Sequence, residues 1–207
     1  MAAMPGCYHP IVYNAYMSSV EPIKSVSIDD YLAAEAVSPV KHEYVDGRLF
    51  AMAGGKNRHN RIATRVLVAL GKQLSSSVCE VYNSDTKVRI QTNARRFFYY
   101  PDSMVVCESN SDDEPYQDRP KVIVEVVSER TRRIDEGEKL VNYLTIDSLN
   151  TYILLEQDRA AARVFERIGT EFIETLFTDA ISVIPLPSIV CELFLTELYS
   201  GIQFKHV

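Results

Sequence analysis

The sequence contains no apolar run of the roughly 20 residues needed to cross a membrane. The segment from Met1 to Val26 has no basic stretch followed by an apolar core, so we expect no signal peptide and a poorly ordered tail over residues 1–26. Internal repeats and low-complexity segments are also missing. These absences argue against a membrane partner and predict one domain over residues 27–207.

The chain has only four cysteines, and its 22 basic residues are outnumbered by 28 acidic residues. None of the four cysteines, Cys7, Cys79, Cys107 and Cys191, are spaced for a zinc knuckle or a redox pair. The last three lie in apolar segments, which predicts buried thiols in a reduced, cytoplasmic protein. The net charge of −6 argues against a non-specific nucleic-acid coat protein, but it leaves room for a nuclease with a local basic patch.

Hydrophobic patterning predicts an α/β (α+β) fold, with a central mixed β-sheet flanked by helices. Asp46-Gly47 predicts an N-terminal hairpin, and Gly169-Thr170 predicts another between 163–167 and 171–177. We expect an acidic loop over 109–118 and a C-terminal β extension that ends in a short apolar helix near 191–199. The predicted helices are 27–36, 57–75 and 136–144, and the other predicted strands are 80–83, 86–91, 97–100, 103–108, 121–128 and 151–155.

Two acidic residues stand at positions where the surrounding pattern is that of strands. Asp102 follows Pro101 and opens the apolar run Ser103–Cys107, and Glu125 lies inside the run Lys121–Ser128. A carboxylate in such an apolar strand is costly unless a cation or strong donors satisfy it. Each residue has a simpler interpretation, because Asp102 could cap a turn and Glu125 could form a buried ion pair. Together on neighbouring strands they predict half of a divalent-metal site for Mg²⁺ or Mn²⁺.

A lysine near such a site would orient the attacking water or balance charge in the transition state. The simplest position lies two residues after the glutamate, where this chain has Val127. Lys139, at the start of the next predicted helix, could reach back to the same site. Alternatively, it pairs locally with Asp135 or Glu136 on the helix surface.

Several segments of the chain together resemble a known family. The arrangement Pro101-Asp102, then Glu125-x-Val127, is similar to the PD-(D/E)XK nuclease superfamily. More narrowly, the order and spacing resemble the Uma-two family of restriction-endonuclease-like proteins, often labelled a domain of unknown function. The similar segments are Lys41–Gly47, Met52–Gly55, His59–Ile62, Ser84–Arg89, Tyr100–Asp102, Val124–Ser128 and Asp135–Lys139.

The resemblance implies a restriction-endonuclease-like core, metal-dependent phosphodiester chemistry and a homodimer, with no organic cofactor. It assigns the metal carboxylates to Asp102 and Glu125, and the displaced lysine to Lys139. It also implies a catalytic role for Glu43 and a further metal-binding role for Asp85. Taken alone, Glu43 could be an ordinary cross-strand residue and Asp85 could cap a turn.

Basic residues follow the Glu125 strand closely. Arg130, Arg132 and Arg133 are candidates for contacts with nucleic-acid phosphates, or they balance the acidic residues around them. His59, at the start of the helix over 57–75, could be a base or a metal ligand. Such a histidine more often caps or covers a helix end, so we place it outside the primary site.

The chemistry predicted from these residues is a metal-dependent endonuclease that cleaves DNA. The alternative is a catalytically degenerate domain that binds nucleic acid or a protein without cleavage. A third reading is a dimerisation module that uses the apolar segment Ile181–Tyr199.

Overall fold

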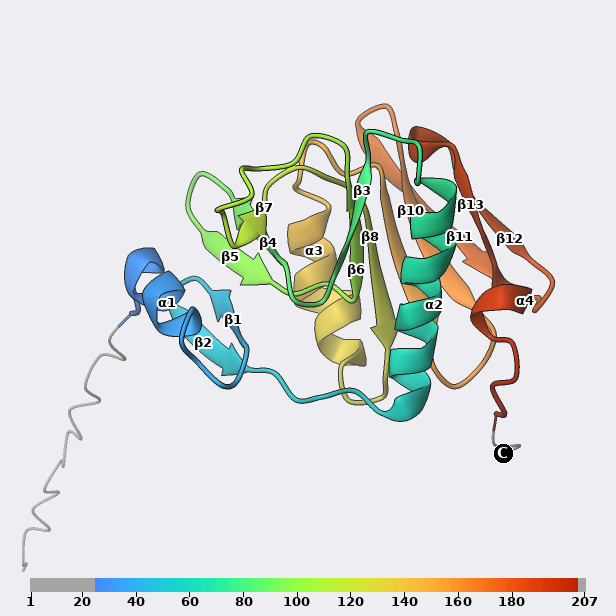
Figure 1. The fold of residues 1–207 in the computed structure, drawn as a ribbon, viewed down its shortest axis with the longest axis horizontal. Coiled ribbons are helices and arrows are strands. Elements are labelled where there is room, and N and C mark those ends of the chain that lie inside the picture. Colours follow the sequence, from blue (N-terminus) through green and yellow to red (C-terminus); the bar gives the residue numbers. More distant parts are fainter. Residues whose placement is uncertain (1–24, 205–207) are drawn as a thin grey trace, which may run out of the picture.

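A six-stranded mixed sheet forms the centre of the computed structural model, which describes residues 25–204 (Figure 1). Its strand order is β11-β10-β9-β8-β6-β3. Strands β8 and β9 are parallel, and the other neighbours are antiparallel. The bounds are β3 (Glu80–Asn83), β6 (Ser103–Val106), β8 (Pro120–Val127), β9 (Thr151–Glu156), β10 (Ala162–Ile168) and β11 (Glu171–Phe177).

A second, five-stranded sheet has the order β2-β1-β5-β4-β7. Helix α1 (Ile28–Glu35) begins at the predicted N-cap Ser27, whose side chain accepts a hydrogen bond from the Asp30 backbone N–H. Tyr31 of this helix packs with Tyr44 and Phe98 of the sheet. The strands are β1 (His42–Val45), β2 (Arg48–Ala51), β4 (Lys87–Gln91), β5 (Arg96–Tyr99) and β7 (Tyr116–Gln117).

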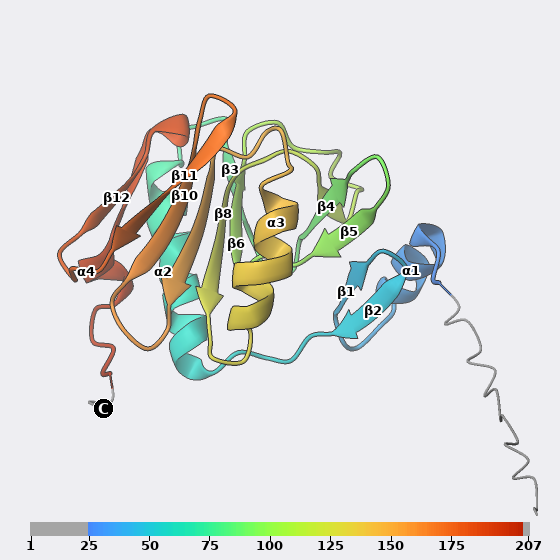
Figure 2. The ribbon, with the colours of Figure 1, turned by 180° about the vertical axis from the view of Figure 1, so that it is seen from behind.

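Helix α2 (Asn57–Gln73) covers one face of the six-stranded sheet (Figure 2). Its residues Ile62, Val66 and Leu70 repeat every four positions and are fully buried. They pack against the even-numbered valines of β8 and against the C-terminal hairpin. In that hairpin, β12 (Val183–Leu186) pairs with β13 (Cys191–Phe194), and a short 3₁₀-helix, η2 (Pro187–Ile189), connects them. Helix α4 (Leu195–Leu198) follows β13.

The crossover between the parallel strands β8 and β9 covers the opposite face. It contains a π-helical turn, η1 (Ile134–Lys139), which continues into helix α3 (Leu140–Tyr143). Because side chains alternate along a strand, Glu125 shares its face with Ile123 and Val127, which pack toward this crossover. The fold therefore places Glu125 beneath the helix that carries Lys139.

The predicted fold class is confirmed, and two local predictions need correction. The loop predicted over 109–118 contains the short strand β7, which pairs with β4. The first half of the helix predicted near 191–199 is the strand β13, because the alternating burial of Cys191–Phe194 suits a hairpin, and the second half is helical over Leu195–Leu198. The predicted tail is Met1–Val26, and residues 1–24 lie outside the described residues.

The prediction that Cys79 and Cys107 are separate thiols is wrong. They form a disulfide that joins the residue before β3 to the residue after β6. Antiparallel pairing places Glu80 opposite Val106, so the two cysteines beyond this pair approach each other. Cys191 is a free buried thiol, as predicted. The argument from the cysteines for a reduced, cytoplasmic setting is correspondingly weakened.

Within residues 25–204, no helix combines the length and apolar character needed to cross a membrane.

Candidate active site

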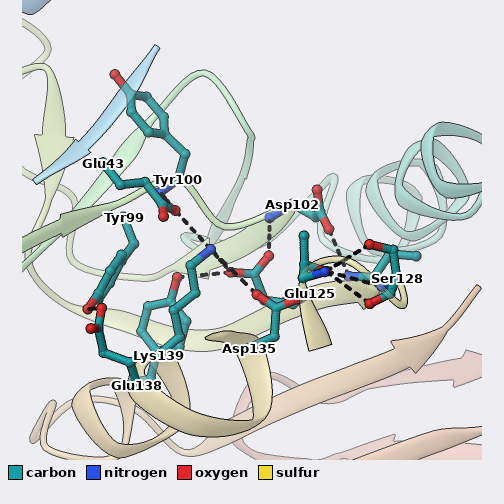
Figure 3. Close-up of polar contacts among 12 residues, drawn as sticks. Glu43, Tyr99, Tyr100, Asp102, Glu125, Ser128, Asp135, Glu138 and Lys139 are labelled. Atoms are coloured by element: carbon teal, nitrogen blue, oxygen red, sulfur yellow. Dashed lines mark hydrogen bonds and ion pairs between the residues drawn. The ribbon is translucent and has the colours of Figure 1, made fainter. Parts of the chain in front are cut away.

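Asp102 and Glu125 meet because strands β6 and β8 pair directly. Ser103 lies opposite Val124, which sets the residue before β6 beside the glutamate of β8. The Asp102 backbone N–H donates to Glu125 Oε2 at 3.2 Å, and the Val126 backbone N–H donates to Asp102 Oδ2 at 2.7 Å (Figure 3). The predicted pairing of the two carboxylates on neighbouring strands is thus present, with each held by a backbone donor.

Lys139 reaches this site from η1. Its ammonium lies 3.1 Å from Glu125 Oε1 and 2.8 Å from Glu43 Oε1, and the Glu43 side chain comes from β1 of the other sheet (Figure 3). Tyr143 of α3 donates its hydroxyl to the same Glu125 oxygen at 3.0 Å. The lysine that Val127 does not provide on β8 is therefore supplied by the crossover helix.

Asp135 is a further member of the cluster that the sequence analysis treated only as a local partner of Lys139. Its Oδ1 lies 3.7 Å from the Lys139 ammonium, four residues along the same turn. Both side chains are buried, so this helical pair faces the sheet instead of solvent. The spacing of four residues was a signal in the sequence, but it did not distinguish a surface pair from a buried one.

Burial and crowding of negative charge perturb the cluster. Burial raises the pKa of Glu125, Lys139 opposes this, and Asp102, Asp135 and Glu43 add to it. Burial alone would lower the pKa of Lys139, but the surrounding carboxylates outweigh burial and raise its pKa well above the usual value. Lys139 is therefore protonated at neutral pH. The site holds more carboxylates than the one buried ammonium can balance.

His59 contacts the site, although the sequence analysis left it outside. Its Nε2 lies 3.1 Å from Asp102 Oδ2 at the start of α2. Burial lowers the pKa of His59, but the hydrogen bond and charge of Asp102 outweigh it, so the pKa is raised overall. The position of His59 in the first turn of α2 could have suggested this contact only with knowledge of how α2 packs.

Asp85, predicted as a metal ligand, lies apart from the cluster. Its side chain is 69% exposed in the turn between β3 and β4, where the carboxylate pairs with Lys41 and the Asp85 backbone N–H donates to Asn83 Oδ1 at 2.9 Å. The metal-binding role of Asp85 stays a prediction, because no contact among the described residues joins this residue to the cluster. Asp85 acts as a turn residue, the alternative considered from the sequence.

The three arginines after β8 have separate environments. Arg132 is engaged by two carboxylates, with NH2 2.5 Å from Glu156 Oε2 and NH1 2.5 Å from Glu136 Oε1. Arg130 and Arg133 are exposed, and neither has an ion-pair partner among residues 25–204. Arg130 and Arg133 are therefore free to make the predicted phosphate contacts, whereas the Arg132 guanidinium is already paired with carboxylates.

The carboxylates fit a divalent cation through their chemistry and charge. Among the described residues, no three His, Cys, Asp or Glu side chains converge on a single metal position. Asp102 and Glu125 can supply two hard oxygen ligands, and the unbalanced buried negative charge would be offset by a cation. Further ligands would have to come from water, backbone oxygens or the substrate.

Comparisons with known proteins show which family model and which proteins this chain is similar to. The Uma2 family profile, described as "Putative restriction endonuclease", matches residues 28–196. The uncharacterized protein slr1290 of Synechocystis sp. is 28% identical over 184 residues, which cover 88% of this chain and 96% of that protein. The uncharacterized protein sll1609 of the same organism is 26% identical over 156 residues, or 74% of this chain and 87% of its own length.

A solved structure shares the fold. The crystal structure of a putative nuclease belonging to DUF820 from Anabaena variabilis superimposes with a TM-score of 0.66 at 14% identity. The superposition covers 84% of this chain and 98% of that one.

Proposed function

Because the chain belongs to the Uma2 family of restriction-endonuclease-like proteins, we propose that it is a metal-dependent nuclease that hydrolyses phosphodiester bonds in DNA. One observation carries the proposal beyond the family. Lys139 reaches the Glu125 carboxylate at 3.1 Å, although the usual strand position of the lysine holds Val127. The paired carboxylates and the lysine that the chemistry requires thus occur in one buried cluster.

Asp102 and Glu125 are the proposed ligands of Mg²⁺ or Mn²⁺. When bound, such an ion supplies stabilisation of the negative charge on the phosphoryl group. His59 and the Val126 N–H both contact Asp102 Oδ2, which fixes the orientation of this carboxylate. Tyr143 and Lys139 fix Glu125 in the same way through Oε1. The protein therefore preorganises both carboxylates before any substrate binds.

Lys139 has a charge-balancing role in this proposal. Its raised pKa keeps the ammonium protonated, so it donates hydrogen bonds and positive charge and does not act as a general base. Glu43 holds the ammonium from the side of β1 at 2.8 Å. A protonated lysine beside the carboxylates can orient a water molecule and stabilise a developing phosphorane charge.

Strand β8 ends and helix α2 begins at the same end of the molecule (Figures 1 and 2). Arg130 and Arg133 follow β8, and Lys56 precedes the first turn of α2. We assign these three side chains to the DNA backbone, since phosphate contacts position a duplex without reading its sequence.

Cleavage of supercoiled plasmid in Mg²⁺ or Mn²⁺ tests the proposal. Asp102→Asn and Lys139→Met should each reduce the rate by at least about 100-fold, because each removes charge stabilisation from the reacting phosphoryl group. Asp85→Ala is the matched control, since it removes an acidic residue outside the cluster. Its rate should stay within about twofold of the wild type.

Full metal-dependent cleavage by Asp102→Asn would place the chemistry elsewhere. Binding of DNA by the wild type without cleavage in either metal would replace the proposal with the catalytically degenerate binding domain. Parallel assays with single-stranded DNA and RNA identify the substrate class.

A further inference from the structure

Arg132 lies in a chain of ion pairs that runs across three strands and the π-helical turn. Its two terminal nitrogens contact both carboxylate oxygens of Glu156 at the end of β9, at 3.0 Å and 2.5 Å. NH1 also lies 2.5 Å from Glu136 of η1. A fork-shaped pairing of this kind fixes direction as well as distance.

The chain continues beyond Glu136. Glu136 Oε2 lies 3.1 Å from Arg163 of β10, and the Arg163 Nε lies 2.7 Å from Glu174 of β11. We call Glu156, Arg132, Glu136, Arg163 and Glu174 the ion ladder. It fastens one residue of η1 to the end of β9 and, on the other side, to β10 and β11.

The ion ladder holds η1, the turn that carries Asp135 and Lys139 of the buried cluster. Glu136 follows Asp135 directly and precedes Lys139 by three residues, and both of these residues point into the buried cluster. Glu136 itself points the other way, toward the arginines. A π-helical turn is uncommon and is often found at functional sites, so its geometry needs support from outside the helix.

Glu156 is suited to anchor the ladder. Its side chain is only 7% exposed, and its backbone lies opposite Val127 in the pairing of β8 with β9. Arg132 lowers the pKa of the Glu156 carboxyl, so this carboxylate stays ionised beside the arginine. The anchor therefore sits on the strand next to the one that carries Glu125.

We propose that Arg132 and Glu156 are positioning residues, which hold η1 through Glu136 so that Lys139 and Asp135 reach the Glu125 carboxylate. Arg132 then acts on the protein itself and does not bind phosphate. The proposal rests on the proposed nuclease function for its effect on catalysis, but the hold on η1 can be measured without activity.

The first measurement compares Arg132→Gln, Glu156→Gln and the double variant, with Glu129→Gln, an exposed residue of the same loop, as the control. Each single variant should lower kcat for DNA cleavage by about 10- to 100-fold, because a small displacement of a catalytic group is costly. The double variant should lower kcat no further than each single variant, since both substitutions remove the same Arg132–Glu156 ion pair. KM and its salt dependence should be unchanged by Glu156→Gln and Arg132→Gln.

A phosphate contact makes the opposite prediction. Arg132→Gln would then raise KM and reduce the slope of log KM against log salt by about 1, while Glu156→Gln would leave kcat as in the wild type. That pattern overturns the proposal.

Hydrogen exchange of the backbone amides over residues 134–140 gives the readout that needs no activity. Arg132→Gln and Glu156→Gln should speed exchange there by about 10-fold or more, and Glu129→Gln should not. Glu174→Gln removes only the exposed outer link of the ladder and keeps the inner links. It should speed exchange over residues 134–140 by a smaller factor, which separates loss of the ladder from loss of folding. Unchanged exchange in both inner variants overturns the proposal even if the protein cleaves DNA. Faster exchange in a protein without nuclease activity supports the ladder and rejects only the proposed function.

Discussion

At the residue scale, the site is defined by an excess of buried carboxylate over cation. Glu125, Asp135 and Glu43 all lie within 4 Å of the single Lys139 ammonium. Such a cluster is stable only if a proton or a second cation offsets part of the charge. Burial raises the pKa of both Glu125 and Asp135, which favours protonation of these carboxyls when no other cation is bound.

The pH dependence of stability should report this proton. The pKa of Glu125 is higher in the folded chain than in the unfolded chain, chiefly through burial, so the folded state binds the proton more tightly. The contribution of this group to stability is then present at low pH and is lost as pH rises through the folded-state pKa. Glu125→Gln cannot lose a proton. Relative to this variant, the wild type should lose about 1 kcal/mol or more between pH 5 and pH 8.

Urea unfolding without divalent metal, repeated across that range, measures the difference. Glu192→Gln, on an exposed face of β13, is the control and should follow the wild type at every pH. A wild type that gains stability relative to Glu125→Gln as pH rises would show that Lys139 fully compensates the cluster.

At the element scale, the glycines that precede α2 affect whether His59 can contact Asp102. Gly55 lies against the His59 ring, and a Cβ there would stand 2.8 Å from His59 Nδ1. Gly54, one residue earlier, has no atom within 4 Å of the equivalent position. The two adjacent glycines therefore differ in a way that sequence alone does not reveal.

Gly55→Ala should displace His59 and loosen its 3.1 Å contact with Asp102. We expect a reduction of kcat for DNA cleavage of about 10-fold, with a loss of unfolding free energy below about 1 kcal/mol because the loop is exposed. Gly54→Ala should change neither quantity. Equal effects of the two substitutions would mean that the loop, and not the histidine, sets the rate.

The sequence was most informative where chemistry and local pattern coincide. Asp102 and Glu125 were recognisable because a carboxylate contradicts the apolar strand around it, and direct pairing of β6 with β8 then followed from their order. For Lys139, the sequence allowed two interpretations, an ion pair on the helix surface or a place in the site. Periodicity could not distinguish an α-helix from the π-helical turn that directs this lysine inward.

The surroundings of Asp85 and Arg132 depend on packing between distant segments, which the sequence does not show. Asp85 has the residue type of a metal ligand, but its turn points toward Lys41. Arg132 has the residue type of a phosphate contact, but strand β9 brings Glu156 to it. The DNA substrate, the homodimer and the cytoplasmic location stay predictions.

At the scale of the whole molecule, the site is assembled from both sheets and the crossover. Glu43 belongs to the five-stranded sheet, Asp102 and Glu125 to the six-stranded sheet, and Lys139 to η1. The relative positions of the sheets thus fix the charge cluster. Strand β3 is one of the two edge strands of the six-stranded sheet, and the Cys79–Cys107 disulfide ties it to β6, the strand that follows Asp102.

This disulfide should stabilise the whole fold, because it restricts the unfolded chain across a sequence separation of 28 residues. Loop-closure entropy for that length corresponds to about 3 to 4 kcal/mol. Thermal unfolding of the wild type in the presence of a reductant should therefore occur at a clearly lower Tm, and Cys79→Ser/Cys107→Ser should match the reduced wild type. The reductant should not change the Tm of this double variant. Cleavage at 25 °C should be the same with and without reductant, since neither cysteine contacts the charge cluster. A wild-type Tm that does not respond to reductant would mean that the two thiols are not joined in solution, and the reduced setting predicted from the sequence would regain its support.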